Sequence, residues 1–153
     1  MQHAKHRRAL TRMVTAKAFE QEEVTREVET LAALARRPFV IVAPDTPIGD
    51  VRRHFIELRV PAILVVDRDD NLVGIVTRTD VLRSRGDARA CDSMSGAVFV
   101  LPVYATVERA AALMAYEGVG QIVVTDDGAL VGVVSALDLV RHYAVEAGYL
   151  VAD

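Results

Sequence analysis

At 153 residues, with 52% hydrophobic and 25% charged side chains, the chain has enough apolar content for a packed core and too much for intrinsic disorder. One cysteine excludes a disulfide within the chain and favours a reducing compartment, and no apolar run approaches the roughly 20 residues that span a bilayer. The net charge is −3, yet residues 1–17 carry five Lys or Arg and no acidic side chain. These charges could bind nucleic acid, but because no aromatic residue is interleaved with them, we favour a basic segment that docks on the acidic body of the protein. We expect a cytoplasmic protein without a secretory signal or a membrane contact.

Residues 10–35 contain no Gly or Pro and are rich in Ala, Glu and Arg, a composition that predicts a helix. Its apolar side chains recur at helical spacing along one face: Val24, Val28, Leu31, Leu34 and Ala35. We expect residues 1–37 to form an N-terminal helical extension that packs on the body of the protein or on a second chain.

A first unit, residues 38–86, begins with a short apolar run that predicts a buried strand. A short amphipathic helix should follow, because apolar side chains recur at steps of three and four: Ile48, Val51, Phe55 and Leu58. The segments 61–67 and 72–77 predict two strands joined by a tight turn, and residues from Asp80 onward predict a second helix.

The same order of elements recurs later in the chain, first at a shift of 59 residues and then, after a shorter turn, at a shift of 58. The strongest match pairs GIVTRTDVL (74–82) with GVVSALDLV (132–140). We therefore expect a second unit at 97–145, a linker at 87–96 and a tail at 146–153. Because such repeats cannot bury their apolar faces alone, the sequence predicts an α+β fold of two strand–helix–strand–strand–helix units packed with pseudo-twofold symmetry.

Each copy places a hydroxyl residue three positions before an aspartate: Thr77 and Asp80 in the first, Ser135 and Asp138 in the second. One explanation is a capping box, although Asp is shorter than the usual Glu or Gln. The other is a ligand site, because a carboxylate at a helix N-terminus can accept hydrogen bonds from the 2′- and 3′-hydroxyls of a ribose. Gly74 and Gly132 lie inside strands, which indicates the close approach of another backbone or of a ligand.

This repeat resembles a tandem pair of CBS domains, the arrangement called a Bateman module. The resemblance covers about residues 38–143, through VIVAPDTPIGDVRRHFIELRVPAILVVDRDDNLVGIVTRTDVL and VFVLPVYATVERAAALMAYEGVGQIVVTDDGALVGVVSALDLV, with DSMSG before the second copy. It implies that the two units pack through their sheets and leave two clefts. In such families these clefts bind adenosine-containing ligands: AMP, ADP, ATP or S-adenosylmethionine.

The resemblance also implies roles for matching positions. Asp80 and Asp138 would hold ribose hydroxyls, with Thr77 and Ser135 beside the sugar or phosphate. The base would lie against the first strand and the entry to the second strand of each unit: Val40, Pro61 and Ala62 in the first, Val98, Gly120 and Gln121 in the second.

Some family members carry His or Arg at the positions of Ala62 and Gln121, where these side chains neutralise phosphates. Here neither position is basic, so we expect AMP or S-adenosylmethionine to be favoured over ATP. Arg78 lies inside the first motif and could reach a phosphate, whereas its counterpart Ala136 could not. We therefore expect the two clefts to differ in affinity.

The leading hypothesis is a stand-alone regulatory, energy-sensing homodimer that needs no cofactor and signals to a protein partner when an adenosine ligand changes its conformation or assembly. The alternative is a ligand-free dimerising scaffold in which the two motifs merely cap helices. Catalysis is not expected, because no catalytic triad, P-loop or dinucleotide fingerprint is present. The four histidines show no metal-ligand spacing with Cys91 or a carboxylate cluster, and residues 67–70 suit a hairpin turn better than a metal loop.

Overall fold

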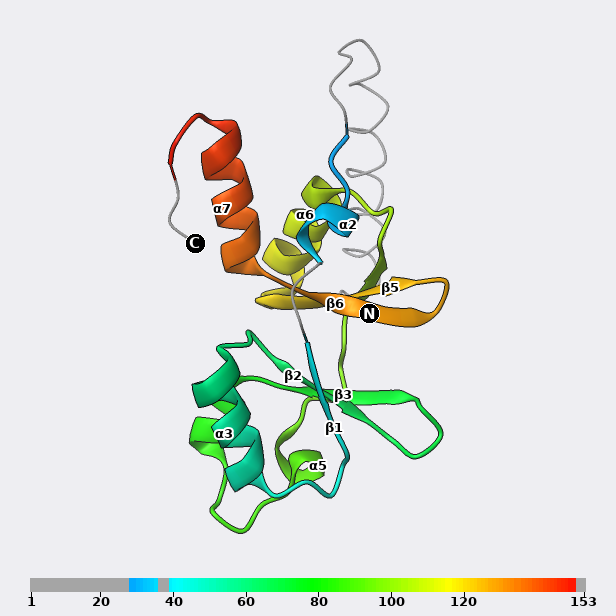
Figure 1. Cartoon of the computed structure of the whole chain (residues 1–153), viewed down its shortest axis with the longest axis vertical. Helices are drawn as coiled ribbons and strands as arrows, with labels where there is room; N and C mark the ends of the chain where they lie inside the picture. Colours follow the sequence, from blue (N-terminus) through cyan, green and yellow to red (C-terminus); the bar gives the residue numbers. More distant parts are fainter. Residues whose placement is uncertain (1–27, 36–38, 151–153) are drawn as a thin grey trace, which may run out of the picture.

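The computed structural model describes residues 28–35 and 39–150, which fold into two units that each contain one three-stranded sheet. The two sheets face each other at the centre of the molecule, and the helices lie on their outer sides (Figure 1). Among the described residues, no helix is both long and apolar enough to cross a bilayer. The α+β fold with two tandem units, predicted from the sequence, is confirmed.

The first unit contains five elements in chain order: β1 (Val40–Val42), α3 (Ile48–Leu58), β2 (Ile63–Val66), β3 (Leu72–Val76) and α4 (Arg78–Arg83). Strand β2 lies in the middle, parallel to β1 and antiparallel to β3. Helix α3 has the predicted amphipathic pattern, since its first three apolar positions are buried. Leu58 departs from the pattern and is 54% exposed.

The second unit repeats this order with β4 (Val100–Pro102), α6 (Val107–Glu117), β5 (Gln121–Asp126), β6 (Ala129–Ser135) and α7 (Ala136–Glu146). Its strand register repeats as well. Ile41 pairs with Leu64 in the first unit, and their equivalents Val100 and Val123 pair in the second. Both antiparallel pairs are interrupted by a bulge at the same point of the repeat, so the internal duplication extends to the irregularities of the sheet.

The two sheets share an apolar core. Buried side chains from both units form it: Ala62, Leu64, Ile75, Val123 and Val133. Each of these is at most 8% exposed. Fully burying one Leu or Ile side chain stabilises a fold by about 1.5–3 kcal/mol, so this layer holds the two units together and fixes how their strand ends sit.

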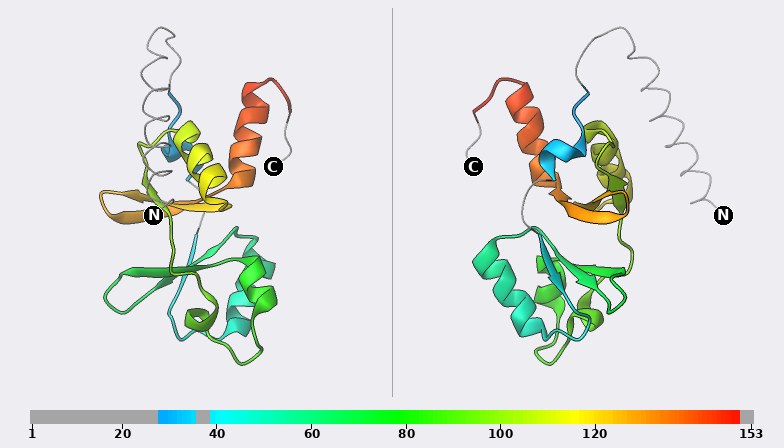
Figure 2. Two further views of the ribbon diagram at one scale, coloured as in Figure 1. Left: turned by 180° about the vertical axis from the view of Figure 1, so that it is seen from behind. Right: turned by 45° about the vertical axis from the view of Figure 1, so that its right-hand side comes forward.

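A short segment before each unit packs on the other unit. Helix α2 (Leu31–Leu34) precedes the first unit, but Leu31 is buried in the core of the second, and its backbone N–H donates to Ala105 at 2.9 Å. Helix α5 (Ala90–Ser93) precedes the second unit, and Ala90 is buried in the core of the first, where its N–H donates to Thr46 at 2.8 Å. Figure 2 shows both short helices beside the sheets that they cover.

These contacts change two expectations about the connecting segments. The helix predicted over 10–35 does not run unbroken through the described residues, because Thr30 is extended and forms a bridge with Thr106. The remainder of that predicted helix, residues 10–27, lies outside the described part of the chain. The segment expected as a linker, 87–96, contains α5 and pairs with the first unit through Arg89 and Ser95.

The two strand glycines are the points where these segments come closest. A side chain on Gly74 would overlap the side chain of Met94, and one on Gly132 would overlap the backbone carbonyl of Ala35. The close approach that the sequence indicated is therefore made by the chain itself at both positions.

Candidate functional site

The strand ends converge at one edge of each sheet. In the first unit, Ile63 pairs with both Val40 of β1 and Val76 of β3. This register brings the start of β1, the entry to β2 and the end of β3 together. The motif residue Thr77 follows directly, so the predicted site residues of one unit lie at one edge of one sheet.

The second unit has the same geometry. Gln121 pairs with Ser135, and the backbone N–H of Ala136 donates to the carbonyl of Gly120 at 2.8 Å. Val98 precedes β4 and packs, partly buried, against the core between the sheets. The residues predicted for each site therefore gather at one edge of the sheet of their own unit.

The first motif forms a complete capping box at the N-terminus of α4. Oδ2 of Asp80 accepts from the backbone N–H and from the hydroxyl of Thr77, both at 2.7 Å, and Oγ1 of Thr77 accepts from the N–H of Asp80 at 3.4 Å. The short aspartate side chain reaches back fully, contrary to the expectation that Asp caps less well than Glu. The motif therefore has a structural role whether or not a ligand binds.

The second motif repeats this box at the N-terminus of α7. Oδ2 of Asp138 accepts from the N–H and the hydroxyl of Ser135, both at 2.8 Å. The surroundings differ, because Asp138 is only 8% exposed and is the one buried charged residue among those described. Asp80 is half-buried by comparison, so the two motifs share the capping box and differ in the exposure of their aspartates.

The capping box of the first motif leaves hydrogen-bonding capacity at Asp80. Both hydrogen bonds that its carboxylate accepts use Oδ2, and within the described chain no hydrogen bond uses Oδ1. A carboxylate oxygen has two lone pairs. Oδ1 can therefore accept hydrogen bonds from the hydroxyls of a ligand while the box stays intact.

Arg78, expected to reach a phosphate, is held by its own unit. Its guanidinium donates to the carbonyl of Val60 at 3.3 Å and lies over the ring of Phe55, 5.9 Å from the ring centroid. The side chain thus covers the C-terminal end of α3. A phosphate would have to compete with these two contacts, which together are worth on the order of 1–3 kcal/mol.

The residues expected against the base are only partly accessible. Ala62 is 1% exposed and belongs to the core between the sheets, so its side chain lines no open surface. Val40 and Pro61 are half-buried, as are Val98, Gly120 and Gln121 in the second unit. The apolar edge of each sheet is present, but it is closed around Ala62.

A pocket of about 550 Å³ also reaches Asp80. It is lined by residues of α4, α5 and the loop between them, all polar or charged except Ala88: Asp80, Arg83, Ser84, Arg85, Asp87, Ala88, Asp92 and Ser93. The hydroxyls of Ser84 and Ser93 share a hydrogen bond of 2.6 Å, which ties α4 to α5. Of the residues assigned to ligand binding from the sequence, only Asp80 lines this pocket.

Sequence reasoning missed the α5 side of this pocket. Residues 87–96 were interpreted as a linker, although Asp92 forms a capping contact like that of the two motifs, accepting from the N–H of Arg89 at 2.8 Å. The signal that could have revealed this is the phrase DSMSG (92–96), whose Met94 packs on Gly74.

Comparison with known proteins identifies the family. The CBS domain profile matches residues 28–87 and 89–145, more than half of the chain, so the chain belongs to the CBS domain family. Each match begins at the short segment before a unit. The protein is therefore a tandem pair of CBS domains, as the repeat indicated.

Individual relatives agree with this assignment. The chain is 28% identical over 121 residues to inosine-5′-monophosphate dehydrogenase of Thermoplasma acidophilum, an alignment that covers 78% of this chain and 25% of that protein. The chain spans between 25% and 60% of the length of the two curated relatives that it matches.

Solved CBS pairs show the same fold. The CBS domain pair of protein MJ0100, crystallised with 5′-methylthioadenosine and S-adenosyl-L-methionine, superposes with a TM-score of 0.72 at 20% identity, covering 78% of this chain and 98% of that one. CBSX2 in complex with AMP superposes with a TM-score of 0.65 at 24% identity, with the same coverage of both chains. These similarities establish the fold of the pair.

Proposed function

We propose that this CBS pair is a regulatory module that binds an adenosine-containing ligand at the strand-end edges of its two sheets. The observation that carries the proposal is the pair of Thr/Ser-x-x-Asp boxes, each at the edge where three strand ends meet. In each box the carboxylate is fixed by its own helix. A fixed carboxylate binds ribose hydroxyls at a smaller entropic cost than a mobile one.

The first unit is the stronger candidate site. Oδ1 of Asp80 accepts no hydrogen bond within the described chain, whereas Asp138 is buried. We propose that the ribose binds at Asp80 and Thr77, with the base against the half-buried edge at Val40 and Pro61. This assignment supports unequal affinities of the two sites.

The chemistry of the ligand follows from the charges near this edge. Arg78 is the basic residue of the motif, and it is already bonded to Val60 and stacked on Phe55. One engaged arginine suits a ligand with one phosphate or a positively charged sulfonium better than a triphosphate. We propose AMP or S-adenosylmethionine as the ligand, the classes that the complexes of CBSX2 and MJ0100 contain.

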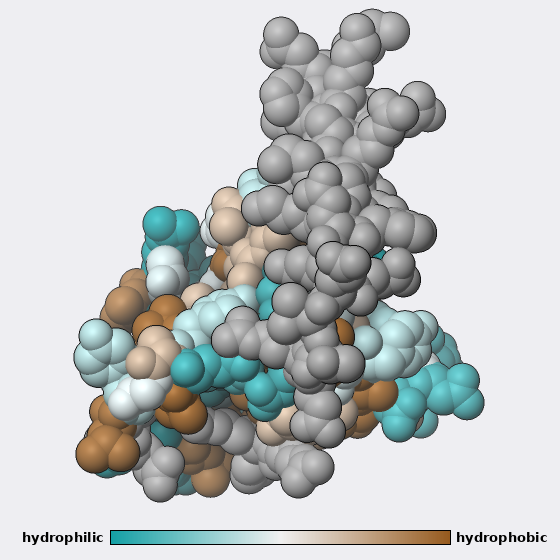
Figure 3. All heavy atoms as spheres, turned by 90° about the horizontal axis from the view of Figure 1, so that it is seen from above, coloured by the Kyte–Doolittle hydropathy of each residue, from teal (hydrophilic) through white to brown (hydrophobic). Residues whose placement is uncertain are grey.

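We also propose that the module works as a homodimer. Exposed apolar side chains remain at equivalent positions of the repeat, since Leu82 on α4 is 85% exposed and Val140 on α7 is 62% exposed. Leu137, one turn before Val140, is 55% exposed. In Figure 3, which views the molecule from above, apolar residues lie at the left beside hydrophilic ones, on the side where α7 lies in Figure 1. A second copy that covers these side chains would remove apolar surface from water.

We also propose that the module is regulatory rather than catalytic and acts in the cytoplasm. A ligand that binds one arrangement of the pair more tightly shifts the population toward it, and a protein partner then meets a changed surface. The single cysteine fits a reducing compartment.

Calorimetric titration of the full chain with AMP, adenosine, ATP and S-adenosylmethionine tests the ligand. A charged hydrogen bond is worth about 1.5–3 kcal/mol, so Asp80→Asn should weaken binding by roughly tenfold or more. Asp138→Asn should change the weaker site only. Asp50→Asn is the matched control, because Asp50 stands in the first turn of α3 and, among the described residues, forms an ion pair only with the exposed Arg53, at 3.2 Å.

Two results would overturn the proposed function. One is the absence of binding by the folded wild-type chain for every adenosine compound, which would favour the ligand-free scaffold. The other is binding that Asp80→Asn and Asp138→Asn leave unchanged. The dimer is tested separately by light scattering, where Leu82→Asp should yield monomers and Leu150→Asp, at a fully exposed position near the C-terminus, should not.

A further inference from the structure

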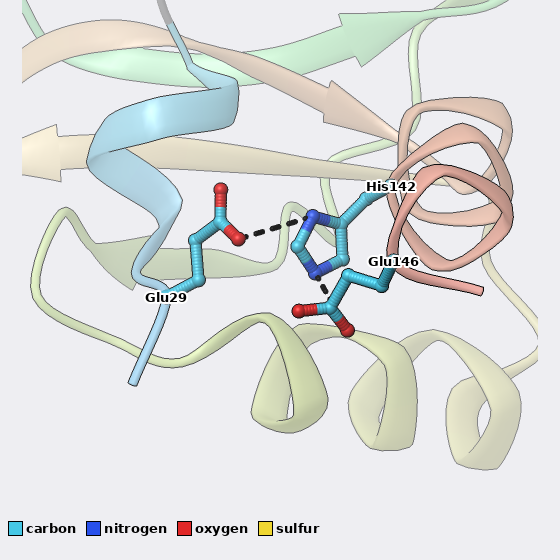
Figure 4. A group of neighbouring side chains, drawn as sticks. All are labelled: Glu29, His142 and Glu146. Carbon is cyan, nitrogen blue, oxygen red and sulfur yellow. Dashed lines mark ion pairs between the residues drawn. The ribbon is translucent and has the colours of Figure 1, made fainter. Parts of the chain in front are cut away.

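A histidine between two glutamates joins the first described segment to the last helix. Nδ1 of His142 lies 3.4 Å from a carboxylate oxygen of Glu29, and Nε2 lies 3.7 Å from a carboxylate oxygen of Glu146. Figure 4 shows that the two carboxylates approach the imidazole from different elements. One oxygen or nitrogen from each of the three residues lies within 4.8 Å of the others.

The backbone fixes where these side chains start. His142 and Glu146 are four residues apart on α7 and therefore share one face of that helix. The carbonyl of Glu29 accepts from the N–H of Val107 at 3.2 Å, at the start of α6, and the next residue, Thr30, bridges to Thr106. The group is thus assembled by the packing of segment 28–35 on the second unit.

Burial and charge distinguish this group from an ordinary surface ion pair. The side chain of His142 is 7% exposed, whereas both glutamates are 45% exposed. Two carboxylates, those of Glu29 and Glu146, lie against the imidazole from opposite sides of the ring. A nearly buried imidazole between two carboxylates offers a cation both nitrogen and oxygen ligand atoms.

We propose that Glu29, His142 and Glu146 bind one zinc-class transition-metal ion, which fastens segment 28–35 to α7. Such ions take imidazole nitrogen and carboxylate oxygen as ligands at about 2.0–2.2 Å, which separates the ligand atoms of a tetrahedral site by about 3.4 Å. Because the side chains of Glu29 and Glu146 are half-exposed, they can rotate and bring their carboxylate oxygens to this separation. The imidazole ligand favours zinc, nickel or cobalt over magnesium or calcium, which prefer oxygen ligands alone.

The test uses the full chain with His3→Gln, His6→Gln and Cys91→Ser in every sample, because these side chains can also bind zinc. Calorimetric titration with zinc chloride should give one site per chain. His142→Gln, Glu146→Gln and Glu29→Gln should each weaken that site at least about tenfold, the scale on which the surroundings of a metal tune its affinity. His54→Gln, on α3 of the first unit, is the matched control and should leave zinc binding unchanged.

Hydrogen exchange separates a three-ligand site from binding by α7 alone. Zinc should slow amide exchange in residues 28–35 and in α7, and Glu29→Gln should abolish the protection of 28–35. Three outcomes would overturn the proposal: no saturable zinc site in the folded chain, a site that survives His142→Gln, or protection that Glu29→Gln leaves intact. The first would identify the group as a histidine ion pair only.

Discussion

The carbonyl oxygen of Ala35 occupies the position where a side chain on Gly132 would begin. Because that oxygen belongs to the backbone of the segment that covers the second sheet, it cannot move without displacing the segment. Gly132→Ala should therefore destabilise the fold by about 1–3 kcal/mol, the usual cost of overpacking. The free energy of unfolding in urea measures this effect.

Two other glycines serve as comparisons for that prediction. Gly74 is the repeat equivalent, but its neighbour is the flexible side chain of Met94, so Gly74→Ala should cost less than Gly132→Ala. Gly96→Ala meets nothing within 4 Å and should be nearly neutral. Equal losses at all three positions would show that the loss of glycine, rather than the contact with Ala35, sets the cost.

Leu31 anchors the segment before the first unit in the core of the second unit. Its side chain is fully buried among residues that include Leu101 and Leu139. Leu31→Ala should lower the free energy of unfolding by about 2–5 kcal/mol, as expected for a buried leucine. Leu150→Ala, at a fully exposed position outside the proposed dimer surface, should change it little. A small loss at Leu31 would mean that the segment contributes little to the fold in solution.

The hydroxyls of the two motifs should stabilise the chain even without ligand. Thr77 and Ser135 each close a capping box, and removing an N-cap side chain costs typically about 1 kcal/mol. Thr77→Ala and Ser135→Ala should therefore lower stability by this amount, whereas Thr77→Ser should retain most of it. Thr79→Ala, at an exposed position of the same helix α4, provides the control in the thermal unfolding of each variant.

The fold could be predicted from the sequence because its signals are local. Hydrophobic spacing placed α3, and the repeated phrase GIVTRTDVL placed β3 and α4 together with their equivalents β6 and α7. The exchange of short segments could not be predicted in this way. The contact of Leu31 with Ala105 joins distant parts of the chain, and four helical residues carry little periodicity of their own.

The sequence indicated the hydroxyl and aspartate pair of each candidate site, but not which of the site residues are exposed to a ligand. Spacing alone indicated that Thr77 and Asp80 act together, and both explanations, cap and ligand site, began from that spacing. The burial of Ala62 and Asp138 depends on how the two units pack, which no single segment reveals. For the same reason the proximity of Glu29 to His142 was missed, since the two residues belong to different ends of the chain.

The turn at Asp67 predicts a small acid sensitivity. Hydrogen bonds, first from the backbone N–H of Asn71, lower the pKa of Asp67 below its ordinary value of 3.8. Because the folded pKa is depressed, the charged carboxylate stabilises the fold above the unfolded pKa, and this contribution disappears as the pH falls through the folded value. Asp67→Asn should therefore be less stable than wild type at neutral pH, and the difference should shrink as the pH falls below 3.8.

Titration of Asp67 by NMR checks the sign directly. A carboxyl pKa below 3.8 in the folded chain supports the hydrogen-bonded turn, and a value at or above 3.8 contradicts it. Asp69 is an exposed residue of the same turn, and its backbone N–H donates to the carboxylate of Asp67 at 2.9 Å. Its own carboxyl group can be titrated in the same experiment for comparison.

Arg78 should decide whether the first site distinguishes ligands by their phosphate. Its guanidinium is bonded to the carbonyl of Val60 and stacked on Phe55, so releasing it to a phosphate exchanges two weak contacts for a strong charged one. Arg78→Met keeps the apolar stem and removes the charge. It should weaken AMP binding about tenfold or more, and adenosine binding by much less. Calorimetry with the two ligands side by side measures the difference, and an equal loss for both would assign Arg78 to the packing of α3 alone.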